Sequence, residues 1–456
     1  PSGRRNSVAD RPPARAGAGV SARVIEAELT WTGRRFEPGL QVVLGDDGRI
    51  EAVAAGRNPT NRHPRCALLP GFVNAHSHAF QRGLRGKGER FPAGSGDFWT
   101  WREAMYALVG RLDERELFRL SVQAFEEMRD AGITTVGEFH YLHHAGDATD
   151  YEFDRVVLEA AAAAGIRIVL LQTYYATGGI GQPLGPAQRR FRSTDVAAYW
   201  KQMDRLDSVL DRRTQSLGAV AHSIRAATVD DIAALHAESA RRRLPFHMHV
   251  EEQRREIEEC VAAYGRPPMR VLLETLDING NLTAVHGTHT APEDLRQFLG
   301  AGGTMCVNPL TEGNLGDGLP VLEPVPDVLD RLCLGSDSNA RISPIEEMRW
   351  LEYGQRLRKE RRGMLRSGEG EVAATVLGAA TAGGARALGV PTGRIEVGHW
   401  GDLVVIDLEH PSLEGSEAET LAEALVTGAD NGVVLGTYVG GNWRKSRNAG
   451  QSTVSS

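Results

Sequence analysis

The stretch Gly71–Leu84, GFVNAHSHAFQRGL, places two histidines directly after a short apolar run. The run has the length of a buried strand, and side chains two apart on a strand point to the same face. His76 and His78 can therefore present two imidazole rings to one cation. The same pair also occurs in ordinary turns, so the rest of the chain has to decide its meaning.

Further apolar runs of strand length follow, and they alternate with amphipathic stretches of helix length such as residues 114–132 and 228–243. This alternation is typical of βα units around a parallel sheet. The eight runs are GFVNAH, ITTVGEF, RIVLLQTY, LGAVAHS, FHMHV, LTAVHG, GTMCVNP and RLCLGSD. Eight units favour a closed barrel over an open doubly wound sheet.

Nearly every run ends in a polar or metal-capable side chain. In a (β/α)8 barrel the carboxyl ends of the strands meet at one mouth, where the active site lies. The side chains are His76, His78, Glu138, His222, His249, His286, Asn308 and Asp337. Their positions favour the barrel and predict a shared site.

The two ends of the chain have a sequence pattern different from that of the βα units between them. Residues 23–53 and 393–446 contain short β-favouring runs separated by turn-rich sequences. We expect one composite β-sandwich domain from residues 23–69 and 389–447, and a barrel from residues 70–388. Residues 1–22, rich in Arg, Pro, Gly and Ala, are expected to be a disordered leader.

Composition argues against several classes of partner. A formal net charge of -7 gives no electrostatic reason to expect nucleic acid or an anionic membrane surface. The four cysteines form no CxxC, so neither a disulfide framework nor a thiolate zinc site is predicted. The apolar segment 156–172 is broken by Glu159, Gly165 and Arg167, and therefore predicts helix, turn and strand. We expect a cytoplasmic enzyme.

Two more strand ends complete a ligand set. His249 and Asp337, together with His76 and His78, give three imidazoles and a carboxylate, which suits a catalytic zinc with a position left for water. Iron, manganese or nickel would accept the same donors. His247 forms a second HxH with His249, and we interpret it as a core histidine. No lysine follows the third or fourth run, so one metal is expected.

Three residues are candidates for catalysis. Glu252 lies three positions after His249, within reach of a water on the metal, although its surroundings also resemble a solvated helix start. His286 ends the sixth run and is predicted to hydrogen-bond the attacking water, or to be a fifth ligand. Asp337 can ligate the metal and also accept a proton from that water.

These residues resemble the amidohydrolase superfamily in order and spacing, over about residues 23–445. Within it the chain is most similar to the formimidoylglutamate deiminases. The stretches HSHAFQRGLRG, DFWTWREAMYALVGRL and EFHYLHH carry the narrower likeness.

The resemblance implies zinc on His76, His78, His249 and Asp337, with Glu252 and His286 in catalysis. It implies hydrolysis of N-formimino-L-glutamate to N-formyl-L-glutamate and ammonia, as in histidine degradation, by a homodimer. The expected substrate contacts are Gln81, Tyr141, His222 and Arg225, with Arg82 as a second candidate beside Arg225 for binding a carboxylate.

Two other interpretations stay open at this point. The same site is compatible with deamination of a purine, a pterin or another amidine-bearing ring, in which case aromatic residues at the mouth would matter more than arginines. A catalytically inactive barrel that serves as a scaffold is the alternative from another functional class.

Overall fold

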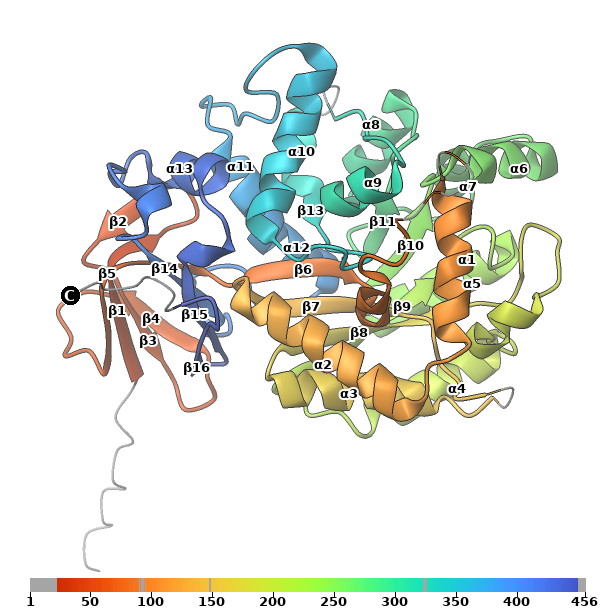
Figure 1. Ribbon diagram of the computed structural model, residues 1–456, viewed down its shortest axis with the longest axis horizontal. Helices are drawn as coiled ribbons and strands as arrows, with labels where there is room; N and C mark the ends of the chain where they lie inside the picture. The colour runs from red at the N-terminus through yellow and green to blue at the C-terminus, as the bar shows by residue number, and fades with distance from the viewer. Residues whose placement is uncertain are drawn as a thin grey trace, which may run out of the picture.

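The computed structural model describes residues 23–89, 91, 94, 96–146, 149–322 and 326–449. A barrel with its surrounding helices forms one side of the molecule, and a mixed sheet built from both chain ends forms the other (Figure 1). The predicted leader, residues 1–22, lies outside the described residues. The limits of the two predicted domains stay predictions.

The eight predicted runs all form strands of one parallel sheet, whose order follows the chain. They are β6 (Phe72–Ser77), β7 (Ile133–His140), β8 (Arg167–Tyr174), β9 (Gln215–Ala221), β10 (Phe246–Val250), β11 (Leu282–His286), β12 (Thr304–Val307) and β13 (Leu332–Leu334). A parallel bridge between Ser77 and Asp337 joins the first strand to the segment after the last. The predicted barrel is therefore confirmed.

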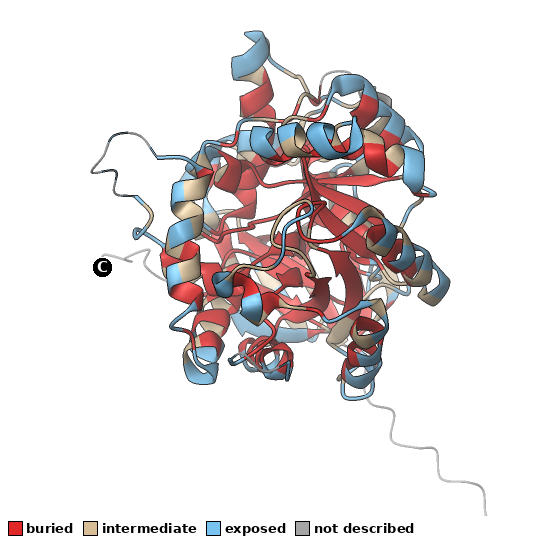
Figure 2. Cartoon of the chain, turned by 90° about the vertical axis from the view of Figure 1, so that its right-hand side faces the viewer, coloured by how far each residue is buried: buried red, intermediate tan, exposed pale blue. Residues whose placement is uncertain are grey.

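Helices cover the outside of the barrel, and their exposed faces contrast with the buried strands inside (Figure 2). Those up to β10 are η1 (Ala79–Leu84), α1 (Phe98–Val109), α2 (Glu114–Asp130), α3 (Glu152–Ala164), η2 (Pro186–Phe191), α4 (Val196–Asp207) and α5 (Val229–Arg242). The later ones are α6 (Arg254–Tyr264), α7 (Pro268–Thr275), α8 (Pro292–Gly300), α9 (Pro309–Leu315), η3 (Pro326–Arg331), α10 (Pro344–Lys359), α11 (Ala373–Gly378), η4 (Ala379–Gly383) and α12 (Gly384–Leu388).

The local sequence explains where α2 begins and which face it buries. The Asp113 side chain accepts a hydrogen bond from the amide of Glu116, which satisfies a free donor of the first turn. Leu117, Leu120, Ala124 and Phe125 recur at helical spacing and are buried. The stripe packs on the barrel, as the periodicity predicts.

The segment 156–172 folds as predicted into helix, turn and strand. Gly165, with φ of 71°, ends α3 in the left-handed conformation that glycine adopts without a steric cost. β8 begins two residues later at Arg167. None of the helices in the described part of the chain is long and apolar enough to cross a membrane.

The strands from the two chain ends form one continuous mixed sheet, with β2 paired to β1. They are β1 (Arg23–Trp31), β2 (Phe36–Pro38), β3 (Gln41–Leu44), β4 (Ile50–Ala54), β5 (Asn61–Pro70), β14 (Leu403–Asp407), β15 (Val434–Val439) and β16 (Asn442–Lys445). The short helices here are η5 (Pro411–Leu413), α13 (Leu421–Gly428) and η6 (Asn431–Val433). The predicted joining of the chain ends is confirmed.

One local prediction for this sheet is wrong, and one strand was not predicted. Residues 393–399, expected to be a strand, form turns because Gly393 and Gly398 adopt φ of 71° and 88°. β5 was not predicted, since a proline within a run argues against a central strand. The register between β1 and β5 shifts beside Pro64 and Arg65, so the proline is accommodated in a bulge.

A buried ion pair ties the two parts together. Arg167, the first residue of β8, donates from Nε to Asp402 at 2.6 Å, and both side chains are almost fully buried. Asp402 also accepts from the hydroxyl of Thr392 and the amide of Gly440. The Arg167 guanidinium lies 4.3 Å from the centre of the Trp400 ring. The Asp402 carboxylate thus links strand β8 of the barrel to the segments next to β14 and β15 of the second sheet.

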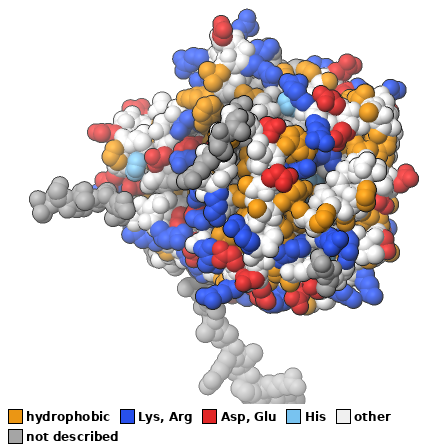
Figure 3. All heavy atoms as spheres, turned by 45° about the vertical axis from the view of Figure 1, so that its right-hand side comes forward, with side chains coloured by type: hydrophobic (Ala, Val, Ile, Leu, Met, Phe, Trp, Pro, Cys, Tyr) orange, Lys and Arg blue, Asp and Glu red, His pale blue; other side chains and the backbone are white. Residues whose placement is uncertain are grey.

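Basic and acidic side chains are interspersed on the face seen in Figure 3. Cys66, Cys260, Cys306 and Cys333 are buried and free, as expected in the absence of a CxxC.

Candidate metal centre and active site

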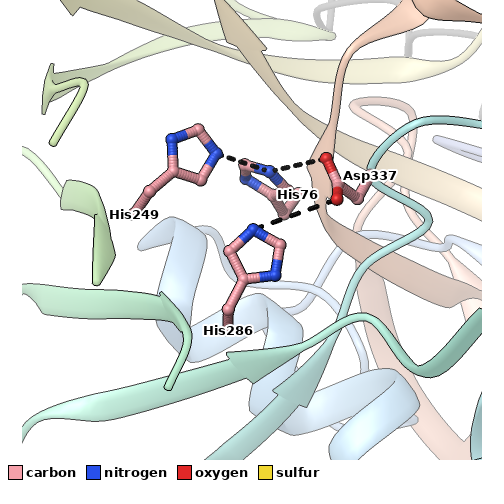
Figure 4. Close-up of side chains that lie close together, drawn as sticks. All are labelled: His76, His249, His286 and Asp337. Carbon is pink, nitrogen blue, oxygen red and sulfur yellow. Dashed lines mark hydrogen bonds and ion pairs between the residues drawn. The ribbon is translucent and has the colours of Figure 1, made fainter. Parts of the chain in front are cut away.

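Five side chains predicted from the strand ends converge at the mouth of the barrel. His76, His249, His286 and Asp337 bring one ligand atom each to within 4.8 Å of one another (Figure 4). His78 joins them, because its Nε2 lies 3.3 Å from Asp337 Oδ1. All five are buried.

The donor atoms of three of these side chains lie close together. His76 Nε2 lies 3.2 Å from His249 Nε2 and 3.3 Å from Asp337 Oδ1. Distances of this size separate ligands that share one small cation at about 2.0–2.2 Å. The arrangement therefore has the spacing of a metal site.

The hydrogen bonds of the rings select the form that binds a metal. His78 Nδ1 donates to the carbonyl oxygen of Phe139 at 2.8 Å, and His249 Nδ1 donates to that of His222 at 3.0 Å. A neutral ring with its proton on Nδ1 leaves a lone pair on Nε2, and backbone carbonyls commonly fix ligands in this way. The residues present fit a divalent cation.

The electrostatics point in the same direction. Burial lowers the pKa of His78 to about 3 and the pKa of His249 well below its usual value, so both rings stay neutral. Burial, the largest influence on Asp337, would raise its pKa, but His76, His286 and His78 together lower it. An ionised carboxylate beside the neutral rings of His78 and His249 is a donor set that suits zinc. His286 differs, because burial would lower its pKa but Glu252, Glu312 and Asp337 together raise it to about 10.

His247 lies one step deeper on the same strand. Its Nε2 lies 2.8 Å from the carbonyl oxygen of Ala387, and the side chain is buried. It has the position and the hydrogen bond of the core histidine predicted for it.

Two residues of the next βα unit contact the Nδ1 side of the His286 ring. Its Nδ1 lies 3.5 Å from Glu312 Oε1 and 3.3 Å from the Asn308 amide. Its Nε2 faces both Glu252 Oε1 at 3.8 Å and Asp337 Oδ2 at 3.9 Å. The ring thus stands between the two carboxylates predicted to move protons. This geometry suits a partner for the attacking water, and it also brings the ring within reach of the metal.

A cavity opens above these residues and contains most of the predicted site. Its lining residues are His78, Gln81, Phe98, Trp101, Arg102, Met105, Tyr106, Tyr141, Tyr175, Phe191, His222, Arg225, His249, Glu252, His286, Leu315 and Asp337. A second, outer cavity of about 530 Å³ shares Arg102, Tyr175, His222 and Arg225 with it. The two cavities therefore lie next to each other on the approach to the histidines.

Gln81 and Tyr141 form a polar pair in the cavity wall. Gln81 Nε2 donates to the Tyr141 hydroxyl at 2.7 Å, while the buried Gln81 Oε1 has no partner among the described residues. Burial raises the pKa of Tyr141 well above its usual value, so its hydroxyl stays a neutral donor. An amide oxygen in want of a donor is suited to a substrate N–H.

Arg225 is buried between two glutamates. Its Nη2 lies 3.5 Å from Glu252 Oε2, and its Nε lies 3.3 Å from Glu256 Oε2. Burial is the main influence that raises the pKa of Glu252 above its usual value. Cation and carboxylates thus lie side by side next to the predicted metal.

The structure adds one residue that the sequence analysis did not single out. Arg102 of α1 lines the cavity, and among the described residues it forms no ion pair and its buried Nε has no hydrogen-bond partner. Its guanidinium lies 4.4 Å from the ring centre of Trp99, three residues earlier. The i, i+3 spacing of Trp and Arg in FWTWRE was the available signal, but the sequence analysis used that stretch only for the family likeness.

Arg82 is in a different place from the one expected. Its guanidinium donates to Glu127 and Gln123 of α2, and it is not among the described residues that line the cavity. Its donors are used by residues of α2, which agrees with the alternative that Arg82 is a surface arginine and gives no support to its role as a carboxylate contact.

A second buried histidine group lies on the other face of the segment that carries Tyr141. His143 Nδ1 lies 2.7 Å from Asp154 Oδ1, and His140 Nε2 lies 3.2 Å from the same oxygen. His143 Nε2 contacts the carbonyl oxygen of Thr173, and Gln202 donates to Asp154 Oδ2. The short, direct contacts are those of a hydrogen-bonded network that anchors this segment.

Comparison with known proteins is consistent with this geometry. Residues 67–444 match the model of the amidohydrolase family. The chain is 39% identical over 396 residues to a formimidoylglutamate deiminase of Pseudomonas aeruginosa, covering 84% of this chain and 86% of that protein. It is 29% identical over 396 residues to a 5-methylthioadenosine/S-adenosylhomocysteine deaminase of Syntrophobacter fumaroxidans, covering 84% and 82%.

The crystal structure of an amidohydrolase from Brucella melitensis superposes with a TM-score of 0.82 at 29% identity, covering 91% of this chain and 94% of that one. The match to the family extends over the barrel and into the sheet from both chain ends. The chain belongs to the amidohydrolase family.

Proposed function

We propose that the chain is a metal-dependent deiminase that hydrolyses N-formimino-L-glutamate to N-formyl-L-glutamate and ammonia. The observation that supports it best is the pairing of a metal-capable floor with two guanidinium groups, Arg102 and Arg225, in the wall of one cavity. The substrate carries two carboxylates and an amidine carbon, which correspond to these two features. The 39% identical relative named a formimidoylglutamate deiminase supports the same assignment.

His76, His78, His249 and Asp337 would hold the cation, most suitably zinc. When bound there, it lowers the pKa of a water molecule towards about 7 and polarises the carbon that water attacks. Asp337 and His286 would orient the water through their Oδ2 and Nε2 atoms, and Asp337 would accept its proton.

Attack forms a bond from the water oxygen to the formimino carbon. Glu252 would give its proton to the terminal nitrogen, and the proton taken up by Asp337 would then pass to the same nitrogen. As the bond from carbon to that nitrogen breaks, the remaining hydroxyl proton would return to Glu252, the formyl carbonyl forms and ammonia leaves. The burial of Glu252 favours its protonated form, which is the form that donates. Gln81, Tyr141 and His222 would bind the formimino group, while Arg225 and Arg102 would each meet a carboxylate.

The second candidate is deamination of an aminopurine, which the aromatic rings of Phe98, Trp101, Tyr106 and Phe191 in the cavity wall would favour. A relative at 29% identity is named a deaminase of that kind of compound. We rank it lower because Arg102, for which the described residues show no ion pair, would face a neutral base without a partner anion.

Release of ammonia is the direct test. Purified protein, assayed with N-formimino-L-glutamate in the presence and absence of a chelator, is expected to release ammonia only in its absence. Adenosine, guanine and S-adenosylhomocysteine serve as competing substrates. Higher kcat/KM for any of these would replace the proposal with the second candidate, and no turnover of any compound by metal-loaded protein would favour an inactive barrel.

A further inference from the structure

We infer that Glu256 is a positioning residue, which holds the Arg225 guanidinium in place so that Arg225 can serve both a substrate carboxylate and Glu252. The inference rests on the proposed function and adds a residue to its carboxylate-binding site. Glu256 is not itself a catalytic residue, because it does not appear among the described residues that line either cavity.

Glu256 is buried beside the Arg225 guanidinium. It is the third residue of α6, its side chain is fully buried, and its Oε2 lies 3.3 Å from Arg225 Nε. Its other oxygen, Oε1, accepts a hydrogen bond from the backbone amide of Glu251. The carboxylate thus connects the guanidinium to the start of its own helix.

The start of that helix is itself fixed. Glu251 has φ of 55°, a conformation that side-chain-bearing residues rarely adopt, and its Oε1 accepts from the amide of Met269 at 2.9 Å. Such a conformation persists where the surrounding contacts over-determine it. Glu256 therefore transmits the position of a rigid turn to Arg225.

The contact with Glu256 does not use the two terminal nitrogens of Arg225. A guanidinium offers five N–H donors in a planar fork, and the Glu256 carboxylate lies at ion-pair distance from Nε, 3.3 Å, without the geometry of a hydrogen bond. Nη2 lies 3.5 Å from Glu252 Oε2, longer than a good hydrogen bond. The donors on the two terminal nitrogens are those that bind a carboxylate in a bidentate manner. Holding Arg225 at Nε keeps this edge available.

Glu252 and the substrate carboxylate would compete for the same donors of Arg225. Without Glu256, Arg225 would be free to rotate about its side chain and to close the 3.5 Å gap to Glu252, forming a full ion pair. That pair would occupy the donors that the substrate carboxylate needs, and it would hold Glu252 in the ionised form, which has no proton to donate. We therefore expect loss of Glu256 to weaken binding of the anionic substrate first, with a smaller loss in turnover.

The test is a double-mutant cycle between Glu256→Gln and Arg225→Met, with Glu258→Gln as the matched control. Glu258 is exposed on the same helix, so the same loss of charge there should change KM and kcat by less than about twofold. Glu256→Gln should lower kcat/KM at least about 30-fold, mainly through KM, as truncation of a buried charged partner usually does. In the Arg225→Met background the same substitution should have almost no effect.

A readout that does not depend on turnover separates this inference from the proposed function. The Kd of glutarate, a plain dicarboxylate, is measured by calorimetry on metal-loaded wild type and on each variant. In the wild-type background, Glu256→Gln should raise the Kd of glutarate by about the same factor as it raises KM. In the Arg225→Met background, the same substitution should leave the Kd of glutarate unchanged. If wild type binds glutarate in this pattern but does not deiminate formimino-glutamate, the function falls and the positioning role stands.

Two results would overturn the positioning role. One is an unchanged KM and glutarate Kd in a folded, metal-loaded Glu256→Gln protein. The other is an equal loss in the wild-type and Arg225→Met backgrounds, which would indicate general damage to α6. Should Glu256→Gln fail to fold, Glu256→Asp carries the same cycle, since it keeps the charge and only withdraws it from Nε.

Discussion

The backbone amide of Asp337 donates a hydrogen bond of 3.0 Å to the carbonyl oxygen of His76. The amide of His78 donates in turn to the carbonyl oxygen of Asp337 at 2.9 Å. These bonds close the barrel between its first strand and the segment after its last one. The residues that close the barrel are therefore the same residues that would hold the metal, and stability and metal binding should be linked.

Removal of the metal is expected to lower the Tm as well as to abolish activity. A cation held by His76, His78 and Asp337 bridges the two edges of the barrel, and a ligand present at about 1,000 times its Kd adds about 4 kcal/mol to the stability of the folded state. Differential scanning calorimetry before and after dialysis against a chelator measures this. Zinc should restore both properties, whereas magnesium should not. Equal Tm values with and without metal would contradict the assignment of the site.

Glu252→Gln should keep the metal and lose turnover. The substitution preserves size and hydrogen bonding but removes the proton that the departing nitrogen needs, and general acid catalysis is worth roughly 10²-fold or more. Metal content by mass spectrometry and kcat from ammonia release provide the two measurements. Near-normal kcat in a metal-loaded variant would remove Glu252 from the mechanism.

Arg102→Met and Arg82→Met should differ sharply. Arg102 lines the cavity, and its Nε has no hydrogen-bond partner in the described part of the chain, so its loss should lower kcat/KM for formimino-glutamate by about 10- to 100-fold, the range of a hydrogen bond to a charged group. The Arg82 guanidinium already donates hydrogen bonds to Glu127, so loss of Arg82 should leave kcat/KM nearly unchanged. The assay is steady-state ammonia release with both variants in parallel. The reverse order would restore the sequence-based expectation for Arg82.

The barrel and its mouth were predictable from the sequence for one physical reason. Strand-length apolar runs end in polar side chains, and parallel strands place those ends at one edge, so His249 and Asp337 could be brought together without knowing any distance. The same logic predicted that His247, two residues before His249, faces the interior one layer deeper.

Arg102 and Glu256 were not predictable in this way. Both lie on helices, where the side chains that enter a cavity depend on how the helix is tilted over the barrel, and periodicity does not determine that tilt. Similarly, β5 was hidden because Pro64 suggests the absence of a strand, and only the pairing with β1 shows that a bulge accommodates it.

Asp402→Asn should destabilise the protein strongly without changing the site. Asp402 is the buried partner of Arg167, and removal of one member of a buried pair costs about 3–5 kcal/mol because the other charge stays buried. Glu409→Gln is the control, since its pair with Arg65 is largely exposed and worth at most about 1 kcal/mol. Thermal unfolding of both variants gives the comparison. Similar Tm values would show that Asp402 is not what holds the two sheets together.

The stabilising effect of Asp154 should depend on pH in one direction. Burial would raise its pKa, but His143 and His140 together lower it below the usual 3.8. A carboxyl group whose pKa is depressed on folding stabilises the folded state above its unfolded pKa and loses this contribution as the pH falls towards the folded one. The Tm difference between wild type and Asp154→Asn should thus be constant from pH 7 to about pH 5 and shrink below about pH 4. A difference that grows on acidification would mean that Asp154 is protonated in the folded protein, and that the two histidines do not hold its charge.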